Sequence, residues 1–267
     1  MLLHHYTSIH NLALILHFKT IRFRRMDLVD DLKEADGVPK PLETCAFISC
    51  WTEDAEESIP LWKMYTQDLA GVMITLPKNP FKEFKYKAGE TIPFSWTHDA
   101  HLSGDQSLYL PAEDYIKENY NIIQFYERPG VNEGFFYKKV EYRDDYKELY
   151  KNMIRRNPIT NITEIIGLFD VGRYKSKKWA FQNECRYTMY ADRSIPLTHA
   201  LIEGDVKKQW EYNRRKYSLE NFPYDQLYPL EQIDLPLREE CVENIIITLG
   251  PKSTISDEFI VKALTSQ

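Results

Sequence analysis

Three polar side chains, Gln182, Glu184 and Arg186, follow one another at every second position. Successive side chains of a β-strand point to opposite faces, so a strand over residues 179–190 would place this amide, carboxylate and guanidinium on one face. The other face would be mostly apolar, with Phe181, Cys185, Tyr187 and Met189. Polar and charged groups are costly to bury unless they pair or bind a ligand. This row is therefore the first candidate for a functional site.

The same pattern also fits an ordinary surface strand. An exposed Glu184–Arg186 pair would contribute only about 0–1 kcal/mol to stability and need not have a function. The residues just before it are basic and aromatic, namely Lys175, Lys177, Lys178, Trp179 and Phe181. This basic and aromatic stretch favours the rim of a cleft. The pattern alone leaves open whether the row is a functional site or an ordinary surface strand.

The composition predicts one domain, spanning residues 1–267, with a substantial core. The chain is 43% hydrophobic and has a formal net charge of −6, which argues against general coating of nucleic acid, although local basic segments could still bind phosphate. No apolar run approaches the roughly 18 residues of a membrane span, and the N-terminus lacks the pattern of a signal peptide. We therefore expect a cytoplasmic protein without membrane contact. The irregular spacing of four cysteines predicts buried thiols and no metal centre.

Hydrophobic periodicity predicts both helices and strands in the first part of the chain. A helix capped by Thr7 or Ser8 and ending near Phe18 is followed by strands over 20–23, 45–51 and 72–76, with a short helix from Pro60. The acidic stretch 27–36 is typical of a polar turn or loop.

The remainder mixes elements without regular alternation. Residues 77–137 are loop-rich and aromatic, and a charged insertion is predicted over about 205–240. Helices are predicted over 111–124, 144–156, 161–175 and 257–264, and strands from 140 and over 245–249. Such a mixture favours an α+β fold, with mixed or mainly antiparallel sheets and flanking helices, over a doubly wound sheet.

Several short segments, in the order in which they occur along the chain, resemble a known family of domains. They are His5-Tyr6-Thr7-Ser8, Asp30-Asp31 with Glu34, Ser49, Leu61-Trp62-Lys63-Met64-Tyr65, Gly71-Val72, Val140-Glu141-Tyr142, Trp179 with Glu184 and Arg186, and Leu249-Gly250-Pro251. Together they resemble an uncharacterised bacterial family of domains of unknown function over nearly the whole chain. The opening His-x-Thr and the glutamate of a late strand are also distantly similar to ADP-ribosyltransferase-type domains. This second resemblance implies an ADP-ribosyltransferase-like core.

The resemblance implies that NAD is consumed as a substrate. Enzymes of that type split the nicotinamide–ribose bond and transfer ADP-ribose to a macromolecule or to water. Departure of nicotinamide leaves an oxocarbenium-like ribose, which a nearby carboxylate stabilises electrostatically. Glu184 is the candidate for this catalytic role, Gln182 would address a protein or nucleic-acid acceptor, and Arg186 would orient Glu184 or bind phosphate.

The same resemblance implies a set of cofactor-binding residues. His5, with Thr7 beside it on the first strand, would position a ribose or the nicotinamide amide. Tyr65, or alternatively Trp62, would stack on the nicotinamide ring. Arg22 would contact the pyrophosphate through its paired donors.

Other functions remain open at this point. The same cleft could bind a nucleotide or a partner peptide without turnover. A nuclease-like site could use a carboxylate set of Asp30, Asp31, Glu34 and Glu184 to hold a metal. A local cluster of His98, Asp99, His101 and Asp105 also has ligand-type side chains.

Overall fold

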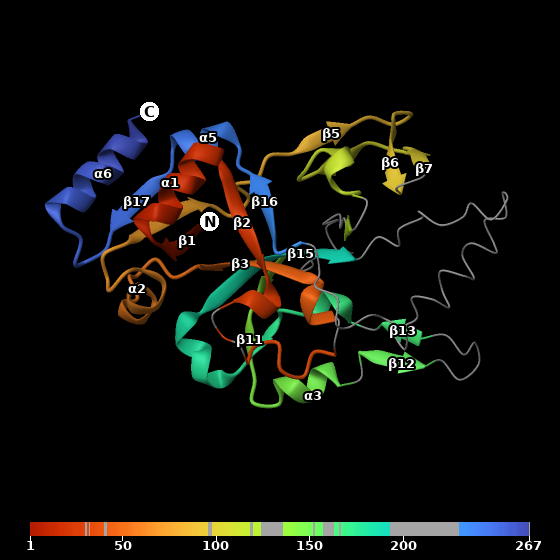
Figure 1. Ribbon diagram of the computed structural model, residues 1–267, viewed down its shortest axis with the longest axis horizontal. Coiled ribbons are helices and arrows are strands. Elements are labelled where there is room, and N and C mark those ends of the chain that lie inside the picture. Colours follow the sequence, from red (N-terminus) through yellow and green to blue (C-terminus); the bar gives the residue numbers. More distant parts are fainter. Residues whose placement is uncertain are drawn as a thin grey trace.

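The protein is a mixed α+β structure with mostly antiparallel sheets and few helices. The computed structural model describes residues 1–29, 31, 33–39, 42–95, 98–117, 120–123, 136–151, 153–156, 163–165, 167–192 and 230–266. Figure 1 shows the strands of the central sheet crossing the molecule, with helices at one end and small hairpins at the other.

A nine-stranded sheet forms the centre of the fold. Its strands are β1 (Leu2–Thr7), β2 (Thr20–Arg25), β3 (Ala46–Thr52), β4 (Val72–Pro77), β9 (Asn121–Ile123), β10 (Tyr137–Lys139), β15 (Glu184–Asp192), β16 (Gln232–Pro236) and β17 (Ile246–Leu249). The main order is β10-β15-β3-β1-β4-β17, while β2 pairs with both β3 and β16, and β9 pairs with β15. All of these pairings are antiparallel.

The sheet forks along one edge of β3. On its other edge β3 pairs with β15 along its whole length. On the forked edge Thr52 pairs with His4 of β1, whereas Phe47 and Ile48 pair with β2. Residues 49–51 lie between these two pairings and are paired with neither β1 nor β2. The two branches of the sheet therefore diverge around the middle of β3.

Helix α1 (Ile9–Phe18) joins the two branches. The hydroxyl of Ser8 caps its N-terminus by accepting a hydrogen bond from the Asn11 backbone at 3.1 Å, as the sequence predicts. The helix ends at Lys19, whose left-handed conformation turns the chain into β2. The chain thus makes a short connection between neighbouring strands, and it holds α1 beside the fork.

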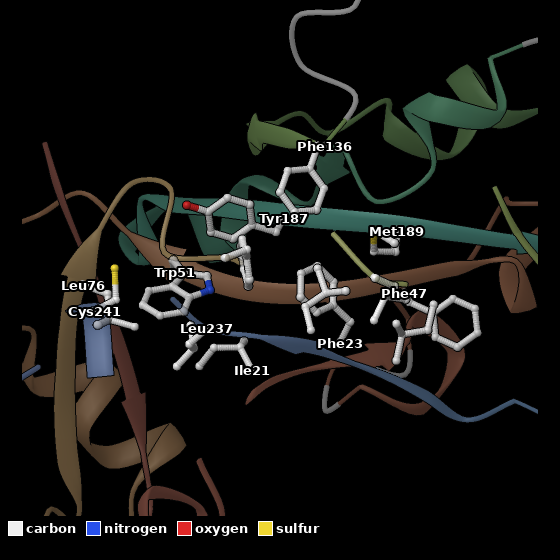
Figure 2. Close-up of a cluster of buried hydrophobic side chains, with 14 of the residues drawn as sticks. Ile21, Phe23, Phe47, Trp51, Leu76, Phe136, Tyr187, Met189, Leu237 and Cys241 are labelled. Carbon is white, nitrogen blue, oxygen red and sulfur yellow. The ribbon is translucent and has the colours of Figure 1, made fainter. Parts of the chain in front are cut away.

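The alternation predicted for the late strand is confirmed from Glu184 onwards. Cys185, Tyr187 and Met189 belong to the main hydrophobic core. Figure 2 shows Tyr187 and Met189 together with side chains of β2, β3 and β4. Because alternate residues share a face, Glu184 and Arg186 point to the opposite side. That side is also buried, so neither face of this strand is an ordinary solvent-exposed surface.

The first part of the predicted strand is wrong. Residues Lys177–Gln182 form a 3₁₀-helix, labelled η5 here, and the strand begins only at Glu184. Asn183 separates the two elements with a left-handed backbone, φ 39°. Phe181 therefore does not join the apolar face and is 46% exposed.

Three predicted helices also need correction. Within 111–124 the structure has only a 3₁₀-turn, Ala112–Asp114, followed by β9, and residues 118, 119 and 124 lie outside the described part. Residues 144–156 give α3 (Tyr146–Tyr150) and then β12 (Ile154–Arg156). Within 161–175 the chain forms β13 (Thr163–Ile165), a 3₁₀-turn over Leu168–Asp170 and β14 (Tyr174–Lys175). Gly167 and Gly172 have positive φ there, which interrupts any continuous helix.

The remaining elements surround the sheet. They are two 3₁₀-turns, Met26–Leu28 and Leu42–Thr44, and α2 (Ile59–Tyr65), β5 (Phe84–Tyr86), β6 (Thr91–Ser95), β7 (His98–His101), β8 (Gln106–Leu108), β11 (Glu141–Tyr142), α5 (Glu239–Glu243) and α6 (Ile255–Thr265). Strand β16 belongs to the central sheet, so the end of the predicted insertion over 205–240 is part of the fold, while 205–229 lie outside the described residues. No helix in the described part of the chain is long and apolar enough to cross a membrane.

Candidate functional site

A cavity of about 610 Å³ opens where the sheet forks. We call it the fork cavity, and its walls include His5, Arg24, Cys50, Tyr65, Gln182 and Glu184. These residues come from β1, β2, β3, α2, η5 and β15, so the divergence of β1 and β2 brings distant parts of the chain together. The volume lies within the range of roughly 300–1,000 Å³ that is usual for small-molecule and cofactor sites.

Four charged side chains form a buried cluster at one wall of this cavity. We call Glu34, Lys175, Glu184 and Arg186 the charge cluster. The Lys175 Nζ lies 3.1 Å from Glu184 Oε2 and 3.3 Å from Glu34 Oε2. The Arg186 guanidinium donates to both carboxylates through Nε and Nη1. Each side chain is at most 5% exposed, and the two cations balance the two carboxylates.

This environment fixes the charge state of the carboxylate. Burial alone would raise the pKa of Glu184, but the positive charges of Arg186 and Lys175 outweigh it and hold the pKa well below its usual range. The pKa of Cys50 moves upward, because burial and then the charge of Glu184 disfavour a thiolate. Glu184 is therefore ionised at neutral pH, whereas Cys50 keeps its proton and is no thiolate nucleophile.

Acid is expected to destabilise the protein through Glu184. Its pKa is lower in the folded state than in an unfolded chain, where it is about 4.3. The stability that its ionised form contributes is present above the unfolded-state pKa and is lost as the pH falls through the folded-state pKa. Urea titrations from about pH 7 down to about pH 3 should therefore show a steeper loss of unfolding free energy in the wild type than in Glu184→Gln.

The matched control for this pH dependence is Glu56→Gln, which removes an exposed carboxylate. We expect it to leave the acid slope close to that of the wild type. Equal slopes for the wild type and Glu184→Gln would contradict the assigned charge state.

Gln182 joins the charge cluster to α2. Lys175 Nζ donates to Gln182 Oε1 at 2.9 Å, and Gln182 Nε2 donates to the Tyr65 hydroxyl at 2.7 Å. Gln182, Glu184 and Arg186 thus lie together, as the sequence predicts. They do not share one strand, however, because Gln182 belongs to the η5 helix and only Glu184 and Arg186 belong to β15.

His5 lies at the fork itself. Its Nδ1 is 2.8 Å from the carbonyl oxygen of Cys50, so the ring satisfies a backbone group in the stretch of β3 that has no neighbouring strand on this edge. The ring also packs 5.0 Å from that of Trp51. Burial lowers the pKa of His5, which favours the neutral ring. With Nδ1 donating to the carbonyl, Nε2 is left as an acceptor. Thr7 also lines the cavity, and its hydroxyl accepts from Asn11 Nδ2 at 3.0 Å.

Trp62 does not belong to this site. It is fully buried in a small core with Tyr6, Leu61 and Met73, and its indole N–H donates to Glu57 at 3.0 Å. It is absent from the walls of the fork cavity, so the prediction that it binds a cofactor is corrected. Tyr65, one helical turn further along α2, does line the cavity.

Arg22 lines the cavity, but its guanidinium is already paired with a carboxylate. Its Nε and Nη2 contact the two carboxylate oxygens of Asp234 at 2.9 and 3.2 Å. Arg24 lies two positions along β2, on the same face, and also lines the cavity. It is exposed and forms no ion pair with any residue in the described ranges. The period of two in β2 is the signal that identifies it.

Glu34 and Lys175 complete the charge cluster, although Glu34 was predicted only as part of an alternative metal-binding set and Lys175 only as part of a basic cleft rim. Glu34 belongs to the acidic stretch predicted as a polar loop, yet it is 2% exposed because Arg186 and Lys175 both pair with it. A buried arginine beside a single glutamate needs a further acceptor, and this need is a sequence signal for a second carboxylate such as Glu34.

The described residues give little support to the two metal sites considered from the sequence, the carboxylate set and the histidine–aspartate cluster. In the described ranges no group of three or more His, Cys, Asp and Glu side chains is placed to hold a metal ion. His101 contacts the Thr91 hydroxyl at 2.8 Å, and Asp105 pairs with Lys87 at 2.7 Å. Asp30 lies outside the described residues.

Comparison of the chain with protein-family models, curated proteins and solved structures found no match.

Proposed function

We propose that this protein consumes NAD, binding it in the fork cavity and cleaving its nicotinamide–ribose bond. The single observation that carries the proposal is that His5 and Glu184, far apart in sequence, line one cavity together with Tyr65 and Gln182. This juxtaposition supports an ADP-ribosyltransferase-like core built on the forked antiparallel sheet. ADP-ribose would pass to a protein, a nucleic acid or water.

Glu184 has the electrostatic character that this reaction needs. Loss of nicotinamide leaves positive charge on the ribose, and an ionised carboxylate fixed beside it lowers the barrier. The cations of the charge cluster keep Glu184 ionised and hold its two oxygens in place. A carboxylate has about four lone-pair sites, so two hydrogen bonds from the cluster leave room for a ribose hydroxyl.

The chemistry of the cavity walls favours one orientation of NAD. We place the nicotinamide end beside Tyr65 and Glu184, and the pyrophosphate beside Arg24. Arginine suits phosphate because its planar donors bind two oxygens together. The side chains of Leu14, Ile15 and Phe18 continue the cavity wall from α1 and would contact the adenosine end.

The test combines a thermal shift with release of nicotinamide. NAD at 100 times its dissociation constant should stabilise the wild type by about 2.7 kcal/mol, and free nicotinamide should accumulate. Arg24→Ala should weaken NAD binding by about 10-fold, because a charge-assisted hydrogen bond contributes about 1.5–3 kcal/mol.

Arg22→Ala is the matched control, since Asp234 already holds that guanidinium. It should change NAD binding much less than Arg24→Ala. Absence of both stabilisation and nicotinamide release would refute the proposed function.

A second candidate is a binding module on the same fold that does not turn NAD over. It is favoured by the pairing of both Glu184 oxygens with buried cations, which offsets much of the negative charge. Saturable stabilisation by NAD without any nicotinamide release would support this alternative over the enzyme.

A further inference from the structure

We infer that Gln182 is a positioning residue that turns the hydroxyl proton of Tyr65 into the fork cavity, where it donates to the nicotinamide carboxamide. This inference rests on the proposed function and deepens it. It gives Tyr65 a polar role in recognising the ligand in addition to the stacking of its ring.

The first step is the orientation of the Gln182 amide. Lys175 can only donate, so the amide atom 2.9 Å from its Nζ must be the oxygen. Lys175 is itself held by Glu34 and Glu184 at 3.3 and 3.1 Å. The amide NH₂ therefore faces Tyr65, and the charge cluster excludes the flipped arrangement.

The second step is the direction of the Tyr65 proton. The hydroxyl oxygen accepts from Gln182 Nε2 at 2.7 Å, so its own proton points elsewhere. No residue in the described part of the chain accepts that proton, although the ring lines the cavity. Burial raises the pKa of Tyr65, with Cys50 and Glu184 adding to the shift, so the hydroxyl remains a donor.

The third step is the chemistry of the ligand. Tyr65 is linked to Glu184 through Gln182 and Lys175, and Tyr65 and Glu184 line the same cavity, so a nicotinamide beside the carboxylate would lie within the cavity that the Tyr65 ring lines. The acceptor that the nicotinamide group offers to such a donor is the carbonyl oxygen of its carboxamide. A donor that a ligand covers without satisfying is unfavourable, so a half-buried donor in the cavity wall discriminates against ligands that lack the acceptor.

Two substitutions test this inference from different directions. Tyr65→Phe keeps the ring and removes the proton. Gln182→Glu places a carboxylate that accepts from both Lys175 and Tyr65, which turns the proton away from the cavity. Each should weaken NAD binding by about 10-fold, and the double variant should be little worse than either single one.

The measurement is calorimetric titration with NAD and with ADP-ribose, which lacks the nicotinamide. Both variants should bind ADP-ribose as the wild type does, an outcome that a general structural defect would not produce. Tyr86→Phe is the matched control, because its hydroxyl also accepts a hydrogen bond, from the Ala112 backbone at 2.9 Å, and it is not among the residues lining the cavity.

The outcomes separate this inference from the proposed function. Wild-type protein that binds NAD, with both variants unchanged, would overturn the inference alone. An equal loss of NAD and ADP-ribose binding would also overturn it, because the nicotinamide would not be the group recognised. Wild-type protein that binds neither ligand would overturn the proposed function together with the ligand assigned to Tyr65.

Discussion

Glu184→Gln is expected to lower the rate of nicotinamide release by about 10²–10³ while NAD still binds. Glutamine has nearly the same shape as glutamate but cannot carry the negative charge that, in the proposed reaction, would face the ribose in the transition state. Interactions made only in the transition state affect the rate constant more than ground-state affinity. Single-turnover release of nicotinamide and a titration with NAD measure the two quantities separately.

The control for this substitution is Glu53→Gln. Glu53 also lies beside the central sheet and pairs with a lysine, Lys139, at 2.6 Å, but it is not among the residues lining the fork cavity. It should leave the rate unchanged. Glu184→Asp keeps the charge of the cluster while moving the carboxylate by one methylene, and a displacement of about 1 Å can cost about 10²-fold in rate. Full activity in Glu184→Gln would show that the Glu184 carboxylate does not take part in the reaction.

The balance of charge around Glu184 explains why both activity and binding without turnover are reasonable outcomes. Two cations beside the carboxylate keep it ionised, yet they also offset part of the field that would stabilise an oxocarbenium-like ribose. Glu34 shares both cations and so reduces this cost. The charge cluster therefore favours an ionised Glu184 without committing all the charge of Lys175 and Arg186 to it.

The alternation of β15 was the part of the site that could be predicted from sequence. A period of two places Glu184 and Arg186 on one face and Cys185 and Tyr187 in the core, and the structure confirms both. The same pattern could not show that Asn183 adopts a left-handed backbone and ends a 3₁₀-helix. That local turn decides where Gln182 lies, and it depends on packing against distant residues.

Other features depend on tertiary pairing and leave little trace in the sequence. The fork arises because β3 receives one neighbour at Thr52 and another at Ile48, and no local motif encodes this. Helical spacing likewise cannot decide which aromatic residue of α2 enters a core and which enters a cavity. Tyr65 was the preferred candidate for stacking and Trp62 the alternative, and the packing of Trp62 against Tyr6 and Met73 places it in a core.

Arg186→Met is expected to destabilise the fold by about 3–5 kcal/mol, the largest effect on stability that we predict. Arg186 is fully buried, and it donates to Glu34, to Glu184 and to the Gly172 carbonyl at 2.9 Å. Its loss would leave two buried carboxylates with only Lys175 to compensate them. Urea unfolding at neutral pH, followed by circular dichroism, measures the change in unfolding free energy.

Arg22→Met provides the matched control, because Arg22 also lies on a strand and pairs with a carboxylate, but its side chain is half exposed. Its removal should change the unfolding free energy by only about 0–1 kcal/mol. Adding Glu34→Leu to Arg186→Met should recover part of the loss, since one carboxylate then balances one lysine. If Arg186→Met is no more destabilising than Arg22→Met, the charge cluster does not act as the coupled ionic unit described above.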